Sequence, residues 1–262
     1  MIETTHQDGV AVVAMRHGKV NALDTALCQA LCGALDQAAA DGAQAVVLTG
    51  TGTVFSAGVD LHRVTAGRDE YLAGFLPELR RVFTRLATFE LPMVAAVNGH
   101  AIAGGYILAA AADWILMAEG PGRAGVTEMA AGLPFPAIAL ELLRMRVGDA
   151  PARPLIAGAA TFRAGSALAR HLIDEAVAAE DLASRSLAAA RRLAALGPAF
   201  RLTKRQLRLL PLARAQDLAV LDADVEAAWQ APPTLDRIRS YMASLKSNAD
   251  SAVAVQTEVL SA

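Results

Sequence analysis

The chain has 262 residues, of which 54% are hydrophobic, with 24 lysine and arginine residues against 26 aspartate and glutamate residues. This length allows one large domain or two small ones, with a sizeable core and alanine-rich helices. The net charge of −2, without long blocks of like charge, argues against a nucleic-acid binder. No stretch suits a membrane span, and the N-terminus lacks the pattern of a leader, so we expect a soluble, cytoplasmic protein.

The two cysteines, Cys28 and Cys32, lie four residues apart in a predicted helix. The spacing could suit a metal or a redox pair, but no Cys-x-x-Cys or His-x-x-x-His motif accompanies it. We interpret both as buried, reduced thiols, and we expect no metal or redox cofactor.

Hydrophobic runs and turn residues indicate the first elements. Residues 10–15 form an apolar, β-branched run that predicts a strand. A helix is predicted over 25–40, with Asp24 as its N-cap and Asp41-Gly42 at its end. Residues 45–49 are again apolar and are followed by glycines, which predicts a buried strand.

The stretch Phe55-Ser-Ala-Gly-Val-Asp-Leu61 follows this strand and leads into a predicted helix. Ser56, Ala57 and Gly58 have small side chains or none, so another group can approach the backbone there. Backbone N–H groups near a helix start lack intrahelical acceptors and can bind a negative oxygen. The alternative is a tight strand-to-helix connection without a binding role.

A similar pattern recurs later in the chain. Polar residues punctuated by glycine predict a mobile flap over 62–76, and a helix is predicted over 77–87. A strand over 92–97 then leads into Asn98-Gly-His-Ala-Ile-Ala-Gly-Gly105 and a helix-favouring run over 106–112. Two backbone donors aimed at one point would form an oxyanion hole.

The remaining chain becomes helical toward its C-terminus. We predict a strand over 113–118, a rigid bend over 132–136, a helix over 137–146, two short helices around Gly158 and Gly165, and a strand over 173–178. Four further helices are predicted over 181–196, 199–210, 213–230 and 233–247, with breaks at Gly197-Pro198, Pro211 and Pro232-Pro233.

The two glycine-rich turns resemble the two signatures of the crotonase superfamily, the enoyl-CoA hydratase/isomerase family. Lys19-Val-Asn-Ala-Leu-Asp24 is similar to that family's acyl-CoA-binding loop, and Gly125-Val-Thr-Glu128 to its catalytic-glutamate segment. The resemblance implies an α/β fold, a spiral of ββα units over 1–195, with a C-terminal helical segment over 196–262. It also implies a homotrimer or a dimer of trimers, and the sequence leaves open which.

The resemblance further implies an enzyme of fatty acid metabolism that acts on an acyl-CoA thioester, with coenzyme A entering only as part of the substrate. The N–H groups of Val59 and Gly104 would hold the thioester oxygen, and Glu128 would act as acid and base. The implied substrate-binding residues are Val20, Ala22, Ser56, Ala57, Gly58, Asp60, Leu61, Ile102 and Ile107.

The sequence departs from the family's hydratases at Ile107, where those enzymes carry a second glutamate. Hydration needs two groups around a water, whereas one carboxylate suffices to move a proton from C2 to C4. We therefore favour a Δ3–Δ2 enoyl-CoA isomerase. A hydratase with a second polar group from elsewhere and a non-catalytic acyl-CoA-binding protein stay open. The candidates for that second group are His62, Glu70, Glu78 and His100.

Several other residues have two interpretations each. Lys19, His62 and Lys204 could contact the phosphates of coenzyme A. A basic series on the C-terminal helices reads as a solvated face rather than a coenzyme A or subunit contact, and comprises Arg191, Arg192, Arg201, Lys204, Arg205 and Arg208. Tyr106 is interpreted as a packing residue.

Overall fold

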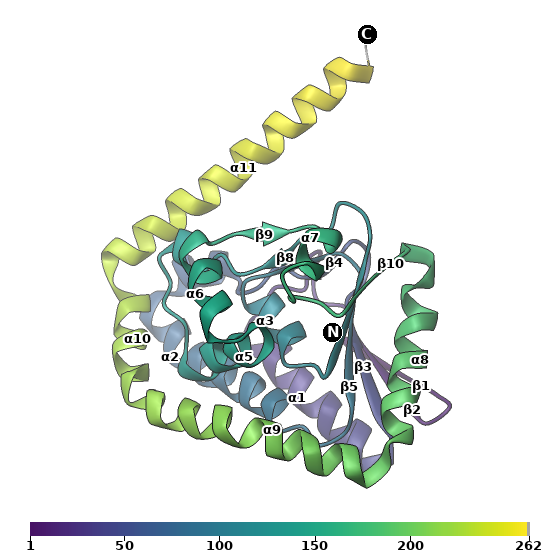
Figure 1. Ribbon diagram of the computed structural model, residues 1–262. Coiled ribbons are helices and arrows are strands. Elements are labelled where there is room, and N and C mark those ends of the chain that lie inside the picture. The colour runs from purple at the N-terminus through teal and green to yellow at the C-terminus, as the bar shows by residue number, and fades with distance from the viewer. Residues whose placement is uncertain (261–262) are drawn as a thin grey trace.

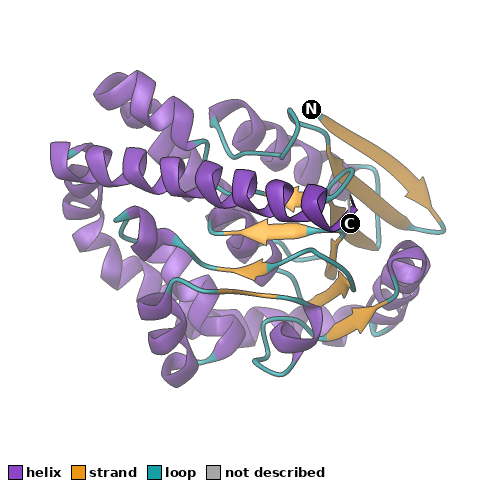
Figure 2. Cartoon of the chain, turned by 90° about the horizontal axis from the view of Figure 1, so that it is seen from above, coloured by secondary structure: helices purple, strands orange, loops and turns teal. Residues whose placement is uncertain are grey.

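The computed structural model describes the backbone of residues 1–260 and the side chains of residues 1–67, 69–245 and 247. Residues 261–262 of the predicted C-terminal segment lie outside the described residues. In the described part of the chain, the strands form two sheets. One has six strands in the order β1-β2-β3-β5-β7-β10, and the other has four strands in the order β4-β6-β8-β9. Seen from above, the short strands of the second sheet lie side by side in the middle of the molecule, with the large sheet beside them (Figure 2).

The large sheet begins with a hairpin that the sequence analysis missed. β1 (Ile2–Gln7) pairs antiparallel with β2 (Val10–Met15). Asp8 and Gly9 join them with φ of 49° and 78°. Two consecutive positive φ values fit a type I′ turn, for which an Asp-Gly pair is a strong signal. The predicted strand over 10–15 is confirmed, but it is the second strand of the chain.

The strands that follow β2 in this sheet are parallel. They are the inner strands β3 (Ala45–Thr49), β5 (Met93–Val97) and β7 (Trp114–Ala118), which are buried on both faces, and the edge strand β10 (Glu175–Val177). Val47 packs in a cluster with α8 (Leu182–Ala195), whereas its neighbours Val46 and Leu48 face the main core. Burial on both faces explains the continuous apolar runs. Figure 1 shows α8 on one face and the other helices on the opposite face.

Two long helices fill the main core. α1 (Thr25–Ala40) begins where predicted, because the Asp24 carboxylate accepts a hydrogen bond from the Leu27 N–H at 2.8 Å. It buries Cys28 and Cys32, which are not joined in a disulfide. This agrees with our interpretation of both as buried thiols.

The predicted flap over 62–76 is wrong. A single helix, α2 (Leu61–Ala87), runs through it and through Pro77. Val64, Leu72, Phe75 and Leu79 recur at helical spacing and are buried. This apolar stripe outweighs the helix-breaking tendency of the glycines and the proline.

The small sheet consists of strands too short to give a periodic signal. They are β4 (Val54–Ser56), β6 (His100–Ile102), β8 (Ala124–Gly125) and β9 (Thr161–Phe162). Four short helices accompany them: α3 (Gly104–Ala110), α4 (Glu128–Ala131), α6 (Asp149–Gly158) and α7 (Ala164–Leu168). The predicted strand over 113–118 and helix over 137–146 correspond to β7 and to α5 (Ala137–Val147).

The C-terminal helices wrap around this body. α9 (Gly197–Leu218) packs on α5, α10 (Asp222–Gln230) packs on α2, and α11 (Pro232–Leu260) contacts α2 and α4 before it extends away from the body (Figure 1). The predicted break at Pro211 is wrong, because α9 continues to Leu218.

Lys204 and Arg208 of α9 are buried, so the predicted solvated face is wrong for both. Lys204 Nζ lies 2.6 Å from an Asp113 carboxylate oxygen and also donates to the Leu91 carbonyl. Arg208 donates to Asp113, to the last two carbonyls of α2 and to the carbonyl of Ala111, which caps the C-terminal end of α3. The cluster fastens α9 to the core, and Lys204 is therefore not available to a coenzyme A phosphate.

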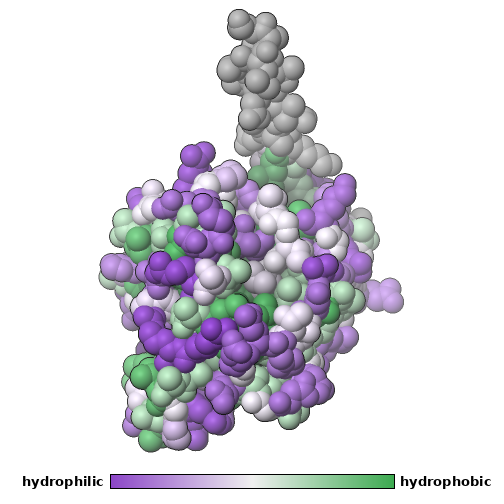
Figure 3. Space-filling view, turned by 90° about the vertical axis from the view of Figure 1, so that its right-hand side faces the viewer, coloured by the Kyte–Doolittle hydropathy of each residue, from purple (hydrophilic) through white to green (hydrophobic). Residues whose placement is uncertain are grey.

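No helix in the described part of the chain is long and apolar enough to cross a membrane. The face at the right of Figure 1 carries hydrophobic residues interspersed among hydrophilic ones (Figure 3).

Candidate active site

The two glycine-rich turns lie against each other. A Cβ atom on Gly58 would stand 2.6 Å from the Ile102 carbonyl oxygen and 3.2 Å from the Gly104 nitrogen. Gly58 has φ of +82°, and Ala103, just before Gly104, has φ of +53°. β4 and β6, which carry the two turns, are paired in parallel. The sheet thus brings both turns to the same place.

Val59 and Gly104 each present a backbone N–H that has no hydrogen-bond acceptor among the described residues. The neighbouring amides are occupied: Asp60 N donates to the Leu23 carbonyl, and Ala103 N to that of Gly125. Gly104 is the first residue of α3, where a helix leaves N–H groups unpaired. The geometry leaves two unpaired main-chain donors on adjoining turns.

The loop over 19–24 is tied to the first turn. Ala57 N donates to the Val20 carbonyl, and Leu23 N donates to the Gly58 carbonyl at 2.7 Å. The buried Ser56 hydroxyl donates to the Asn21 carbonyl at 2.7 Å. These bonds hold the loop beside β4.

A cavity of about 370 Å³ opens beside the turns, with mostly apolar walls. It brings together seven of the twelve residues that the sequence analysis assigned to catalysis or substrate binding: Ala57, Val59, Leu61, Ile102, Gly104, Ile107 and Glu128. Five others do not line it. Val20 and Ala22 lie in the neighbouring loop, while Ser56, Gly58 and Asp60 hold the turn in shape. Asp60 is the N-cap of α2, and its carboxylate accepts from Arg63 N.

Glu128 begins α4, and its side chain faces the cavity. Its Oε2 atom is buried and has no hydrogen-bond partner in the described part of the structure. Burial raises the pKa of Glu128 to about 7, against a smaller opposite effect of the Glu128 and Thr127 N–H groups. A carboxyl group with this pKa can accept and return a proton near neutral pH.

The raised pKa predicts a pH-dependent stability. Glu128 binds its proton more tightly in the folded than in the unfolded protein, whose value is near 4.5. Its stabilising contribution is complete below pH 4.5 and is lost as the pH rises through 7. We expect the free energy of unfolding of the wild type, relative to Glu128→Gln, to fall by about 2–3 kcal/mol over this window. Urea unfolding at pH 4.5, 6 and 7.5 measures this difference, and parallel curves would contradict the assignment.

Sequence comparison identifies the family. The model of the Enoyl-CoA hydratase/isomerase family matches residues 5–228. The chain belongs to this family, within the crotonase superfamily.

The relatives carry both activity names. A Thermus thermophilus protein named as an enoyl-CoA hydratase is 39% identical over 197 residues, which are 73% of this chain and 77% of that protein. A Mycobacterium tuberculosis protein, named an enoyl-CoA isomerase with one solved structure and an enoyl-CoA hydratase with another, superposes in the first with a TM-score of 0.78 at 34% identity, covering 85% of this chain and 97% of that one. The human mitochondrial Δ3–Δ2-enoyl-CoA isomerase superposes with a TM-score of 0.86 at 27% identity, covering 94% of this chain and 98% of that one. These structures confirm the predicted α/β fold with its helical C-terminal part.

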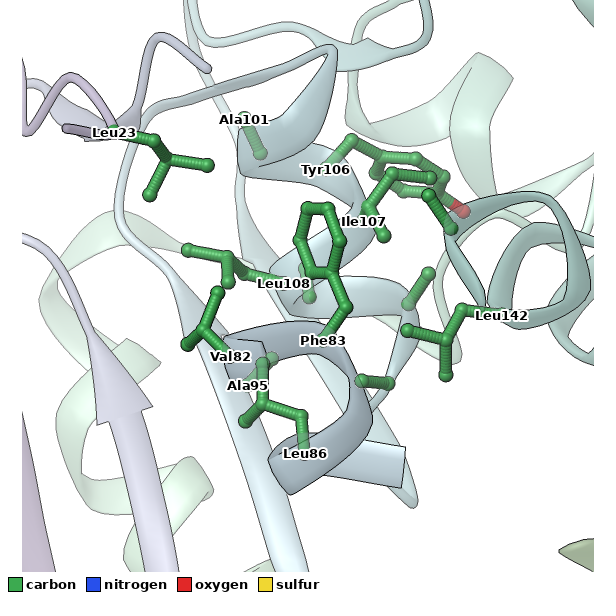
Figure 4. Close-up of a cluster of buried hydrophobic side chains, with 14 of the residues drawn as sticks. Leu23, Val82, Phe83, Leu86, Ala95, Ala101, Tyr106, Ile107, Leu108 and Leu142 are labelled. Atoms are coloured by element: carbon green, nitrogen blue, oxygen red, sulfur yellow. The ribbon is translucent and has the colours of Figure 1, made fainter. Parts of the chain in front are cut away.

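In this family member, Ile107 occupies an apolar wall of the cavity. The residue is fully buried. Figure 4 shows its side chain directed from α3 toward Phe83 of α2, within a cluster that also contains Leu142. The sec-butyl side chain of isoleucine can neither activate nor hold a water molecule.

The structure narrows the choice of a second polar group. Among the described residues, Glu128 supplies the only carboxylate that lines the cavity. His62 and Glu70 are exposed on α2, and Glu78 pairs with Arg81. His100 does line the cavity. Tyr106 packs in the core and donates to the Leu172 carbonyl, which agrees with our interpretation.

Several cavity residues could not be found from the sequence. Phe83 comes from α2, and Trp229 and Tyr241 come from α10 and α11, far along the chain. Arg123 and Thr161 come from the short strands β8 and β9 and their ends. No local motif marks these positions, because only tertiary packing brings them to the cavity. No group of three or more potential metal ligands occurs in the part of the chain that the structure describes.

Proposed function

We propose that the protein is a Δ3–Δ2 enoyl-CoA isomerase. Among the described residues that line the cavity, Glu128 is the only carboxylate, and it carries this proposal together with the apolar Ile107, where a hydratase needs a second acid. In the proposed reaction the thioester oxygen lies between the N–H groups of Val59 and Gly104. Two fixed main-chain donors stabilise an enolate without reorganisation.

The proton balance of this reaction needs one base. Glu128 removes a proton from C2, and the electron pair of the C–H bond moves into the enolate. The double bond shifts from C3–C4 to C2–C3 when Glu128 returns the proton to C4. A carboxyl group with a pKa of about 7 suits both directions of transfer. The apolar cavity keeps competing water away from the dienolate.

Hydration of a 2-enoyl-CoA is the second candidate, and two observations favour it. The Thermus relative bears the hydratase name, and His100 lines the same cavity as Glu128. Burial and the positive charge of Arg123 lower the pKa of His100, so its imidazole is neutral near pH 7 and could hold a water.

Assays with paired substrates separate the two candidates. We expect formation of a conjugated 2-enoyl thioester from 3-enoyl-CoA and little loss of that conjugation when 2-enoyl-CoA is supplied. Ile107→Glu should gain hydration by at least about tenfold, since two carboxylates can then share a water, at a stability cost of several kcal/mol for a buried acid. Robust hydration of 2-enoyl-CoA by the wild type would contradict the isomerase proposal. Absence of turnover with both substrates would leave only acyl-CoA binding.

We also propose that the protein forms a homotrimer or a dimer of trimers. Large apolar side chains project from the C-terminal helices: Leu202 (57% exposed), Leu207 (71%), Leu209 (68%), Leu210 (69%) and Val220 (79%). Several large exposed apolar side chains within about twenty residues of chain favour a contact with another protein surface. Light scattering coupled to gel filtration measures the assembly, and a monomer would contradict this proposal.

A further inference from the structure

One wall of the cavity is polar. His100, Arg123 and Thr161 all line it, and they belong to three neighbouring strands or strand ends of the small sheet. His100 and Arg123 each precede a residue of the pair Ala101–Ala124, so they stand opposite each other on adjacent parallel strands. Thr161 is paired with Gly125 on the next strand. The other walls carry mostly apolar side chains.

Arg123 keeps unused donors in this wall. Its Nε donates to the Thr161 hydroxyl at 2.8 Å, and one terminal nitrogen donates to the Thr161 carbonyl. These two bonds fix the guanidinium but use two of its five N–H groups. Within the described side chains, no carboxylate lies within ion-pair distance of Arg123. Arg123 is therefore an oriented, solvent-exposed cation in this wall, with Thr161 as a hydrogen-bond partner and no ion-pair partner among the described side chains.

The strand order places this cation away from the coenzyme A loop. Asn21 of that loop donates to the Val54 and Phe55 carbonyls, so the loop lies at the β4 edge of the small sheet. Arg123 precedes β8, two strands further across, and Thr161 lies on β9 at the opposite edge. If the thioester lies between the turns, with its coenzyme A on the loop side, the acyl chain runs toward Arg123.

We propose that Arg123, supported by Thr161 and with His100 beside it, binds a carboxylate carried by the acyl chain of the thioester substrate. This inference rests on the proposed function, because it assumes that the thioester lies between Val59 and Gly104. Arg123 precedes Glu128 by five residues, and His100 precedes Gly104 by four. At roughly 3.3 Å per extended residue, the Cα atoms of Arg123 and Glu128 lie at most about 16 Å apart, and those of His100 and Gly104 at most about 13 Å apart. All four residues line the same cavity. The substrate is thus a thioester of a dicarboxylic acid.

Binding measurements test the specificity without requiring turnover. The probes are two saturated acyl-CoA thioesters of equal chain length, one ending in a methyl group and one in a carboxylate, with free coenzyme A as a third ligand. We expect the wild type to bind the carboxylate-bearing ligand more tightly. Arg123→Gln should lower the affinity for the carboxylate-bearing ligand by about 10- to 100-fold. It should lower the affinity for the methyl-terminated ligand by less than about threefold.

Two further variants serve as controls. Arg123→Lys retains a cation but not the planar fork, and it should recover part of the lost affinity. Arg153→Gln removes an exposed arginine of α6 outside the cavity and should change neither affinity. Thermal unfolding of each variant shows whether it is folded. If Arg123→Gln does not fold, the affinities of Arg123→Lys for the two thioesters are compared with those of the wild type instead.

The outcomes separate this inference from the proposed function. Equal affinities of the wild type for both thioesters would overturn the carboxylate site while leaving the proposed function intact. An equal loss for free coenzyme A and both thioesters in Arg123→Gln would assign Arg123 to a phosphate and overturn the inference. Failure to bind any acyl-CoA would overturn the proposed function together with the inference.

Discussion

Replacing Glu128 by glutamine should reduce the isomerisation of 3-enoyl-CoA by about 10³- to 10⁴-fold, the upper part of the range for a lost general acid or base. The amide has nearly the shape of the carboxyl group, but it cannot take a proton from C2. In the described part of the cavity wall, no other carboxylate can replace it. Stopped-flow measurement of conjugated thioester formation gives the rate.

Acyl-CoA affinity should change little in this variant. The thioester is held by main-chain donors and by apolar walls, which Glu128→Gln leaves in place. The matched control is Glu70→Gln on the exposed surface of α2, which should retain full activity. Retention of more than about a tenth of the wild-type rate by Glu128→Gln would remove the glutamate from the mechanism.

Replacing Gly58 by alanine should have the second large effect. The new Cβ would meet the Ile102 carbonyl oxygen at 2.6 Å and the Gly104 nitrogen at 3.2 Å, so the two turns must separate. Both free N–H groups lie in those turns. We expect kcat to fall by about 10²- to 10³-fold, as when one oxyanion donor is lost. A steady-state assay of conjugated thioester formation from 3-enoyl-CoA measures kcat.

Gly42→Ala is the matched control for backbone strain. Gly42 has φ of +78°, close to that of Gly58. It lies just after the end of α1, and a Cβ atom there would meet only open space. Strain alone should cost about 1–2 kcal/mol of folding free energy in either variant, without lowering kcat in Gly42→Ala. Similar kcat values for the two variants would show that contact between the turns does not matter for catalysis.

The sequence predicted those parts of the fold that carry a long or strongly patterned signal. The strands over 10–15 and 45–49 are apolar runs, and α1 has both a capping aspartate and a terminating glycine. The long helix α2 was predicted only in part. Its glycines and Pro77 resemble loop residues locally, while the buried stripe that stabilises it depends on the core. α9 likewise continues through Pro211, although a proline is locally a helix-breaking signal.

The candidate site was predicted where backbone chemistry leaves a local pattern. Small residues in the two turns indicated where main-chain donors could lie, whereas Glu128 was indicated only by the resemblance of Gly125-Val-Thr-Glu128 to the family's catalytic-glutamate segment. The side chains that shape the cavity left no such pattern. Trp229 and Tyr241 reach it from helices that follow the ββα region, and strands as short as β8 and β9 cannot be recognised by alternation.

A crystal structure with a bound saturated acyl-CoA tests the central claim most directly. The account predicts that the thioester oxygen lies 2.7–3.1 Å, about the range for oxyanion donors, from both Val59 N and Gly104 N. It also predicts that C2 faces the Glu128 carboxyl group. A thioester oxygen bound elsewhere, or a Glu128 side chain turned away from C2, would contradict it.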